Sequence, residues 1–449
     1  MEDRKVSIQL SDHFTYKKLI RFTLPTIAMM IFTSIYSIVD GFFISNFAGK
    51  IPFAAINLIM PVLMILGTVG FMFGTGGTAL VSMTYGQGDK ERANRYFSLL
   101  VYVAFIIGII FAVAGWIFIR PIAAGLGAEG ELLVNCVKYG RIILVALPFY
   151  ILQVLFQTFL VAAEKPQFGL IMTLISGGIN MVLDAVLVIS LPQDYKLIGA
   201  AIATATAQTV GGLIPLVYFL RKNSSILRLG KTRFEGSVLV KACTNGASEF
   251  MSNISMSIVG MLYNSQLMKY AGENGLAAYG VMMYVSMIFA AIFVGYTVGI
   301  APVIGFHYGA QNHEELKGLR KKSIRIIGIS GICMVIAAQL LATPLAKIFV
   351  GYDKALYELT VSGFRIFACS FFFMGFAIFI SGFFTALNDG LTSALISFLR
   401  TLVFESAAIM LLPLIFQITG VWFSVVVAES MAFVIGFLLL FVKRKKYNY

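Results

Sequence analysis

Apolar stretches of about 20 residues or more recur along the whole chain, and they restrict what it can fold into. A helix of that length spans the hydrocarbon core of a bilayer, whereas a soluble core of 449 residues cannot cover so many such stretches. Composition agrees, because 59% of the residues are apolar and only 12% are charged. The sequence therefore predicts an all-α polytopic membrane protein, and not a soluble enzyme.

Charged or turn-forming segments divide the apolar stretches into twelve predicted transmembrane helices. They cover residues 18–46, 53–84, 95–119, 136–161, 168–191 and 197–220, and then 239–269, 277–308, 323–345, 359–386, 392–416 and 419–442. The longest polar connection lies in mid-chain. We therefore expect an N-terminal six-helix lobe at 1–221, a cytoplasmic linker at 222–238 and a C-terminal six-helix lobe at 239–449.

Lys and Arg residues are distributed unequally between the two sides of these helices. Of the 34, 24 fall on the side that holds both termini, and nine fall on the other side or at helix ends there. Loops rich in Lys and Arg stay in the cytoplasm. We therefore expect a multi-pass protein of the cytoplasmic (inner) membrane with both termini inside the cell. The net charge of +13 serves this orientation, so no nucleic-acid partner is expected.

The two halves of the sequence resemble each other. A shift of 223 residues aligns FAGKIPFAA at 47–55 with YAGENGLAA at 270–278. The same shift pairs Gly76 with Gly299, Tyr85-Gly86 with Tyr308-Gly309 and Asp89 with Asn312, and a shift of 221 pairs Gly199 with Gly420 and Gln208 with Glu429. Each half holds six helices, so both enter the membrane from the same side. This predicts two bundles related by a pseudo-two-fold axis along the membrane normal, as in transporters built from parallel repeats that work by alternating access.

Five acidic residues fall within predicted spans: Asp40, Asp184, Glu249, Glu405 and Glu429. A charged residue at the centre of a lipid-facing helix costs about 2.5–3.5 kcal/mol, so these side chains must face protein or water. A carboxylate in such a place can bind a proton or a cation.

Two of these acids are expected to meet in the first lobe. Asp40 and Asp184 come late in helices that both start at the cytoplasm, with Tyr36 and Asn180 one turn before them. Thr204 reaches a similar depth from the opposite direction. The group predicts a proton-coupling site that could also hold Na⁺ at Asp40, Asn180, Asp184 and Thr204. The alternative is structural: Asp40 caps a helix break and Asp184 hydrogen-bonds a neighbouring helix.

The remaining acids within predicted spans, Glu249, Glu405 and Glu429, are candidates for contacts with the substrate or with Arg400. Glu249 and Asn253 share one face of a helix near the cytoplasmic side, where an anion would attract lipophilic cations. Alternatively, Glu249 pairs with Lys241 or Arg400. Glu405 could pair with Arg400, and the repeat relates Glu429 to Gln208, which suggests an interior position for both. We include Gln208 and Glu429 with Glu249 and Asn253 as candidate substrate-binding residues.

Nothing in the sequence calls for a resident cofactor. The four cysteines lie far apart, the histidines form no metal-ligand pair, and the Gly-rich segment 71–79 lacks the Lys-Ser/Thr ending of a phosphate loop. No ATP-binding motif is present. The expected energy source is therefore an ion gradient of H⁺ or Na⁺.

Six segments together resemble the multidrug and toxic compound extrusion (MATE) family, and within it the MepA-like bacterial branch. They are SIVDGFFISNFAG (37–49) with AAINLIMPV (54–62), GTGGTALVSMTYGQGD (74–89), NMVLDAVLV (180–188), GAAIATATAQ (199–208) and GASEFMSNIS (246–255). The resemblance covers essentially the whole chain. It implies two six-helix lobes around a cavity and an antiporter that exports lipophilic, often cationic, drugs in exchange for H⁺ or Na⁺.

The resemblance also implies roles for individual residues. It puts Asp40, Asn180, Asp184 and Thr204 at the ion site with Tyr36 adjacent, and Glu249 at the acidic position of the seventh helix. Relatives with a cation site in the C-terminal lobe carry an aspartate in the tenth helix, but 359–386 has no acid. This favours protons at the first lobe. The expected partners are small lipophilic cations and membrane lipid, with the monomer as the functional unit. A flippase for lipids or lipid-linked saccharides is the alternative function.

Overall fold

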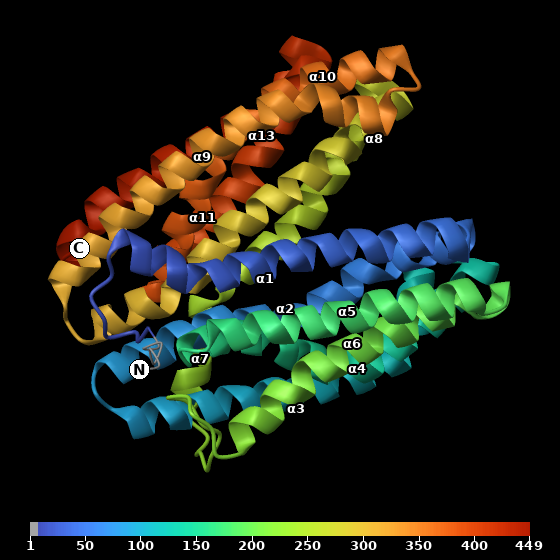
Figure 1. Cartoon of the computed structure of the whole chain (residues 1–449). Helices are drawn as coiled ribbons and strands as arrows, with labels where there is room; N and C mark the ends of the chain where they lie inside the picture. Colours follow the sequence, from blue (N-terminus) through green and yellow to red (C-terminus); the bar gives the residue numbers. More distant parts are fainter. Residues whose placement is uncertain (1–7) are drawn as a thin grey trace, which may run out of the picture.

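The structure is a computed structural model that describes residues 8–449, and within that range it consists of helices and their connections (Figure 1). Residues 1–7, which the orientation prediction includes, lie outside this range. The first bundle contains α1 (Tyr16–Phe43), η1 (Ile44–Ala48), α2 (Lys50–Gly86), α3 (Lys90–Gly125), α4 (Gly130–Ala162), α5 (Pro166–Ser190), η2 (Gln193–Tyr195) and α6 (Lys196–Leu220). The second contains α8 (Ala247–Gly309), α9 (His313–Val350), α10 (Lys354–Ala368), α11 (Ser370–Ala386), α12 (Gly390–Phe398), η3 (Leu399–Phe404) and α13 (Glu405–Tyr447). The short helix α7 (Gly236–Asn245) leads into α8 but packs on α2, with Val238 and Ala242 in the core of the first bundle.

The twelve predicted spans are confirmed in the described range, although two pairs run together. Nine helical stretches are long and apolar enough to cross a membrane, and α10 with α11 forms a tenth, bent by 42°. Gly272 breaks α8 and Gln417 breaks α13, because both have non-helical backbone angles. Each break divides one long stretch into two spans.

The repeat is visible in local chemistry. After α2, Asp89 caps α3 by accepting a hydrogen bond from the Arg92 backbone at 2.9 Å. After α8, the related residue Asn312 caps α9 by accepting one from the Glu315 backbone at 3.1 Å. Equivalent turns therefore begin equivalent helices, by the usual preference for Asp and Asn at the N-cap.

The two bundles meet at the end of the molecule where both chain ends lie, and they diverge toward the other end (Figure 1). We call the first end the termini side and the second the far side. A Cβ on Gly86 would lie 2.1 Å from the Phe306 carbonyl oxygen, and one on Gly309 would lie 2.0 Å from that of Met83. These two contacts exchange under the 223-residue shift. Glycines thus let the backbones of α2 and α8 touch in a two-fold manner.

The N-terminal segment 8–15 bridges the bundles on the termini side. The Leu10 backbone donates to Glu164, in the α4–α5 turn, at 2.7 Å. The Phe14 backbone donates to Glu315, at the start of α9, at 2.9 Å, and His13 Nδ1 lies 2.6 Å from the same carboxylate. The Leu10 and Phe14 side chains are buried. This segment therefore links the two bundles where they meet.

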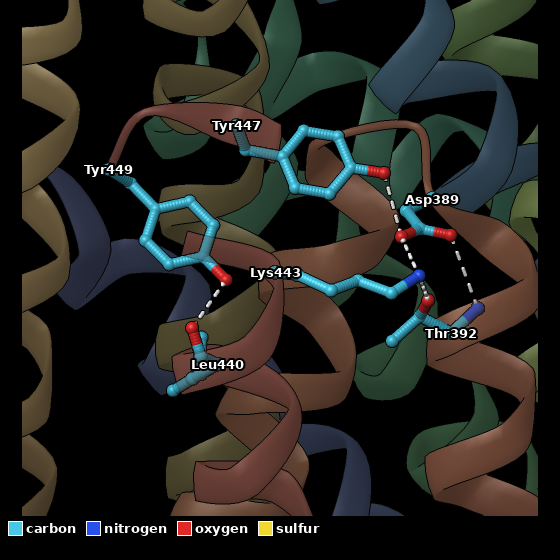
Figure 2. Close-up of polar contacts among 6 residues, drawn as sticks. All are labelled: Asp389, Thr392, Leu440, Lys443, Tyr447 and Tyr449. Atoms are coloured by element: carbon cyan, nitrogen blue, oxygen red, sulfur yellow. Dashed lines mark hydrogen bonds and ion pairs between the residues drawn. The ribbon is translucent and has the colours of Figure 1, made fainter. Parts of the chain in front are cut away.

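The C-terminus is anchored within its own bundle (Figure 2). Lys443 Nζ and the Tyr447 hydroxyl each donate to Asp389, between α11 and α12, at 2.7 Å. The Tyr449 hydroxyl donates to the Leu440 carbonyl at 3.1 Å, and its ring is fully buried. These contacts hold the end of α13 against the start of α12.

Candidate ion-exchange site

The predicted first-lobe site is assembled in the far half of the N-terminal bundle. Asp40 on α1 and Asp184 on α5 lie beside each other, and Asn180 lies beside both carboxyl groups. Asp184 and Asn180 are buried, at 0% and 2% exposure. The structure thus brings the two acids together in one polar group inside an otherwise apolar bundle.

Local sequence explains this placement. Asp184 follows Asn180 by four residues and Asp40 follows Tyr36 by four, so each pair shares a helix face. Gly177, one turn before Asn180, lets α1 approach α5, because a Cβ there would lie 3.0 Å from the Tyr36 ring. Tyr36 accordingly lies near Asp40. On α6, the Thr204 hydroxyl accepts a hydrogen bond from Asn180 Nδ2 at 3.4 Å.

Several acceptors of the site are unpaired. Among the described residues, four of its buried oxygens have no hydrogen-bond partner: Asp40 Oδ1, Asn180 Oδ1 and both carboxylate oxygens of Asp184. None of the ion pairs between described residues involves Asp40 or Asp184. Two neighbouring carboxylates without a cation repel each other, and a shared proton or a small cation would relieve that repulsion.

A metal site of the usual kind is not formed by the residues described. No group of three or more His, Cys, Asp or Glu side chains is placed to hold a metal ion within 8–449. Oxygen ligands for Na⁺ would come from two carboxylates, one amide and one hydroxyl. A proton needs only the two carboxylates.

Sequence reasoning missed Tyr139, which α4 contributes. It is 1% exposed, its hydroxyl lies beside Thr204, and it is close to both carboxylates. Its depth in the membrane could have been predicted from the sequence. Helix α4 begins on the far side, and Tyr139 lies in its third turn, at the level of Asp40 and Asp184. A buried phenol at that depth can donate a hydrogen bond to a carboxylate.

The candidate substrate residues lie apart from this site. Glu249, in the first turn of α8, belongs to the termini half of the other bundle. Asn253 Nδ2 donates to the Glu249 backbone carbonyl at 2.9 Å. The Glu249 carboxylate has no ion pair among the described residues, so neither Lys241 nor Arg400 neutralises it. Gln208, on α6, has a buried side-chain oxygen that accepts no hydrogen bond from any residue in 8–449.

Glu429 is engaged by Arg400. The Arg400 guanidinium donates to both Glu429 oxygens, with its shortest bond at 2.7 Å, and the two side chains are 19% and 7% exposed. Glu429 is buried, as the repeat with Gln208 suggested. The sequence offered Glu405 as the partner of Arg400, but the hydrogen bonds of Arg400 are made with Glu429.

Comparisons with known proteins agree with this architecture. The MatE family model matches twice, over residues 25–186 and 250–410, once in each half. The chain is 26% identical to the multidrug export protein MepA of Staphylococcus aureus over 96% of this chain and 94% of the relative. It is also 26% identical to MepA of Staphylococcus haemolyticus, over 95% and 93% of the two chains.

Solved structures have the same fold. An outward-facing multidrug resistance MATE family transporter superposes with a TM-score of 0.92 at 22% identity, covering 99% of both chains. A transporter of the MOP superfamily from Pyrococcus furiosus superposes with a TM-score of 0.90 at 22% identity, over 99% of both chains. The chain belongs to the MatE family, whose members are multi-pass membrane transporters and not enzymes.

Proposed function

We propose that this protein exports small lipophilic compounds, often cationic, across the cytoplasmic membrane in exchange for protons. Relatives that align over nearly the whole chain are named multidrug export proteins. The observation that supports the coupling is the pair Asp40–Asp184, two adjacent carboxyl groups that form no ion pair with a Lys, Arg or His side chain of the described residues. A proton is the simplest ion that satisfies this pair.

In the proposed cycle, the pair takes up a proton from the far side while the bundles diverge there, as in this structure (Figure 1). Protonation removes the repulsion between Asp40 and Asp184 and favours closure of the far side. After the change to the opposite state, the proton leaves to water on the termini side, which we take as cytoplasmic. The pair is then again negative, and cationic cargo binds more strongly.

We propose that Glu249 attracts cationic cargo on the cytoplasmic side, because its carboxylate forms no ion pair with the residues that the structure describes. Asn253 lies one turn away on the same face, and Gln208 and Glu429 remain candidate contacts. Arg400, the cation that the sequence places within a span, is occupied by Glu429. It is therefore not free to hold a lipid phosphate, which favours drug export over the flippase alternative.

The proposal also keeps the division into lobes at 1–221 and 239–449 with a linker at 222–238, and the monomer as the functional unit. The linker packs on α3 of the first bundle. The Gly230 backbone donates a hydrogen bond to Ser98 at 3.0 Å, and the Arg228 backbone donates one to Asn94 at 2.6 Å. Each lobe can then rotate as a unit while the linker follows the first lobe.

The test is dye transport in proteoliposomes with pH and sodium gradients imposed separately. Transport driven by the pH gradient alone supports proton exchange, and transport driven only by sodium assigns Na⁺ to the same site. Asp184→Asn should abolish gradient-driven transport. Asp194→Asn, which changes an exposed acid on η2, is the matched control and should transport normally. Full gradient-driven transport by Asp184→Asn would refute the assignment.

A further inference from the structure

A second cluster of ionisable side chains lies inside the C-terminal bundle. It consists of Arg400, Glu405, Glu429, Tyr263 and Tyr279, which we call the C-lobe cluster. Arg400 is bound to Glu429 through three hydrogen bonds of 2.7–3.0 Å. Glu405 lies close to both members of that pair, and the Tyr263 hydroxyl lies beside the Glu405 carboxyl group.

The π-helical segment η3, Leu399–Phe404, positions two members of the cluster. In a regular α-helix, residues five apart point about 140° away from each other. A π-helix bonds residues five apart and so brings them toward one face, and such segments are often found at functional sites. Arg400 and Glu405 are five apart across this segment, and it turns both toward Glu429 on α13.

The charges of the cluster do not balance. One guanidinium stands against two carboxylates, and its hydrogen bonds are all made with Glu429. The remaining groups that face Glu405 are the phenols of Tyr263 and Tyr279, whose rings stack 5.1 Å apart. Ion pairs of Glu405 are absent among the described residues. Glu405 therefore carries the unmatched negative charge.

The repeat relates this cluster to the first-lobe site. A shift of 221 residues takes Asp184 to Glu405 and Gln208 to Glu429, and a shift of 223 takes Asp40 to Tyr263. The cluster thus occupies the place in the second bundle that the ion-exchange site occupies in the first. A tyrosine replaces one of the two acids, and an arginine supplies a permanent positive charge nearby.

We infer that Glu405 is a second proton-exchange group, with Arg400 and Glu429 as a fixed pair that positions it. Its carboxylic acid releases a proton to water in one conformation, and the carboxylate takes a proton up again in the other. Glu405 makes no ion pair among the described residues, whereas Glu429 is buried and held by Arg400, so Glu405 is the member of the two that is free to exchange a proton. Its part in transport rests on the proposed function, but its protonation can be measured without transport.

Infrared difference spectroscopy between acid and alkaline pH tests the protonation on the purified full-length protein. In D40N/D184N, the first-lobe acids no longer contribute, and a carboxylic-acid band that disappears at alkaline pH should remain. Adding Glu405→Gln should remove that component, whereas adding Glu249→Gln should leave it in place. Identical spectra for D40N/D184N and D40N/D184N/E405Q would overturn the inference.

A milder variant guards against loss of folding. Tyr263→Phe keeps the ring and removes the hydroxyl beside Glu405, so it should move the pH midpoint of the same component. An unchanged midpoint would show that the component does not arise from Glu405.

Transport provides the second readout. Glu405→Gln should lower the limiting dye gradient by about tenfold for each pH unit of driving gradient, because one coupled proton contributes that factor. An unchanged limiting gradient would overturn the role in coupling. If wild-type protein shows no pH-driven transport but the Glu405 component is present, the proposed function fails and the second site stands. If transport is pH-driven and the component is absent, only the second site fails.

Discussion

Within residues 8–449, Asp40 and Asp184 of the first bundle lie side by side without an ion pair, whereas in the second bundle Glu429 binds Arg400 and leaves Glu405 without an ion pair. The two arrangements occupy positions related by the internal repeat. A duplicated fold has therefore kept the location of its polar group and changed how the charge is neutralised. Under the proposed function, an exchangeable ion neutralises the acids in the first bundle, whereas Arg400 neutralises one of the two acids in the second.

The largest expected effect is on the free energy of unfolding, which substitutions in the two bundles should change in opposite directions. Arg400→Gln leaves Glu429 buried without its partner, which typically costs about 3–5 kcal/mol. Asp184→Asn instead removes one of two like charges and should raise the unfolding temperature. Thermal unfolding of both full-length variants in one detergent gives the comparison.

The double variant Arg400→Gln/Glu429→Gln is the control, because it removes both charges together. It should recover most of the lost stability. A loss of similar size in Asp184→Asn and Arg400→Gln would show that the two bundles do not differ in this way.

The two-fold contact between the bundles gives the next test. Gly86→Ala and Gly309→Ala each force a methyl group onto a backbone carbonyl about 2 Å away, and overpacking of this kind costs about 1–3 kcal/mol. Each should shift the population toward the state that is open on the termini side, measured by the accessibility of a cysteine introduced at the interface. Gly260→Ala, with nothing within 4 Å of its new Cβ, is the control.

The informative result is the ratio of the two effects. Because Gly86–Phe306 and Gly309–Met83 are related by the repeat, the two substitutions should act almost equally. If the two substitutions shift the population by very different amounts, the Gly86–Phe306 and Gly309–Met83 contacts have the same geometry but contribute different free energies to closure.

Sequence patterns were enough for the spans, the repeat and the approach of Asp40 to Asp184. Hydrophobic length and the period of the helix determine these features directly. They also placed both breaks in the long helical stretches, because Gly272 falls in the predicted connection 270–276 and Gln417 in the predicted connection 417–418. What they did not predict is that helix continues on both sides of a single non-helical residue, so that two pairs of spans run together in the structure.

Pairing between distant helices was harder to predict. Arg400 could be matched with Glu405 by spacing along one span, but its partner Glu429 lies in the part of α13 that follows the break at Gln417. The π-helix η3 that turns Arg400 and Glu405 to one face has no clear sequence signal. Tyr139 was missed for a similar reason, since an aromatic residue within an apolar run is most often packing.

The smallest expected effect concerns the C-terminal anchor of the second bundle (Figure 2). Burial alone would raise the pKa of Asp389, but hydrogen bonds from Lys443, Tyr447 and Thr392 outweigh it and hold this pKa below the usual 3.8. Asp389→Asn should cost about 1–2 kcal/mol at neutral pH, because it weakens hydrogen bonds to a charged acceptor.

The pH dependence separates this contribution from packing. A carboxyl group with a lowered pKa stabilises the fold fully above its unfolded value, and the benefit is lost as pH falls through the folded value. The difference in unfolding temperature between wild type and Asp389→Asn should therefore be constant from pH 7 to about 5 and shrink below the unfolded pKa of 3.8. A difference that stays constant at acid pH would mean that Asp389 acts through shape alone. The anchor would then hold the end of α13 without using its charge.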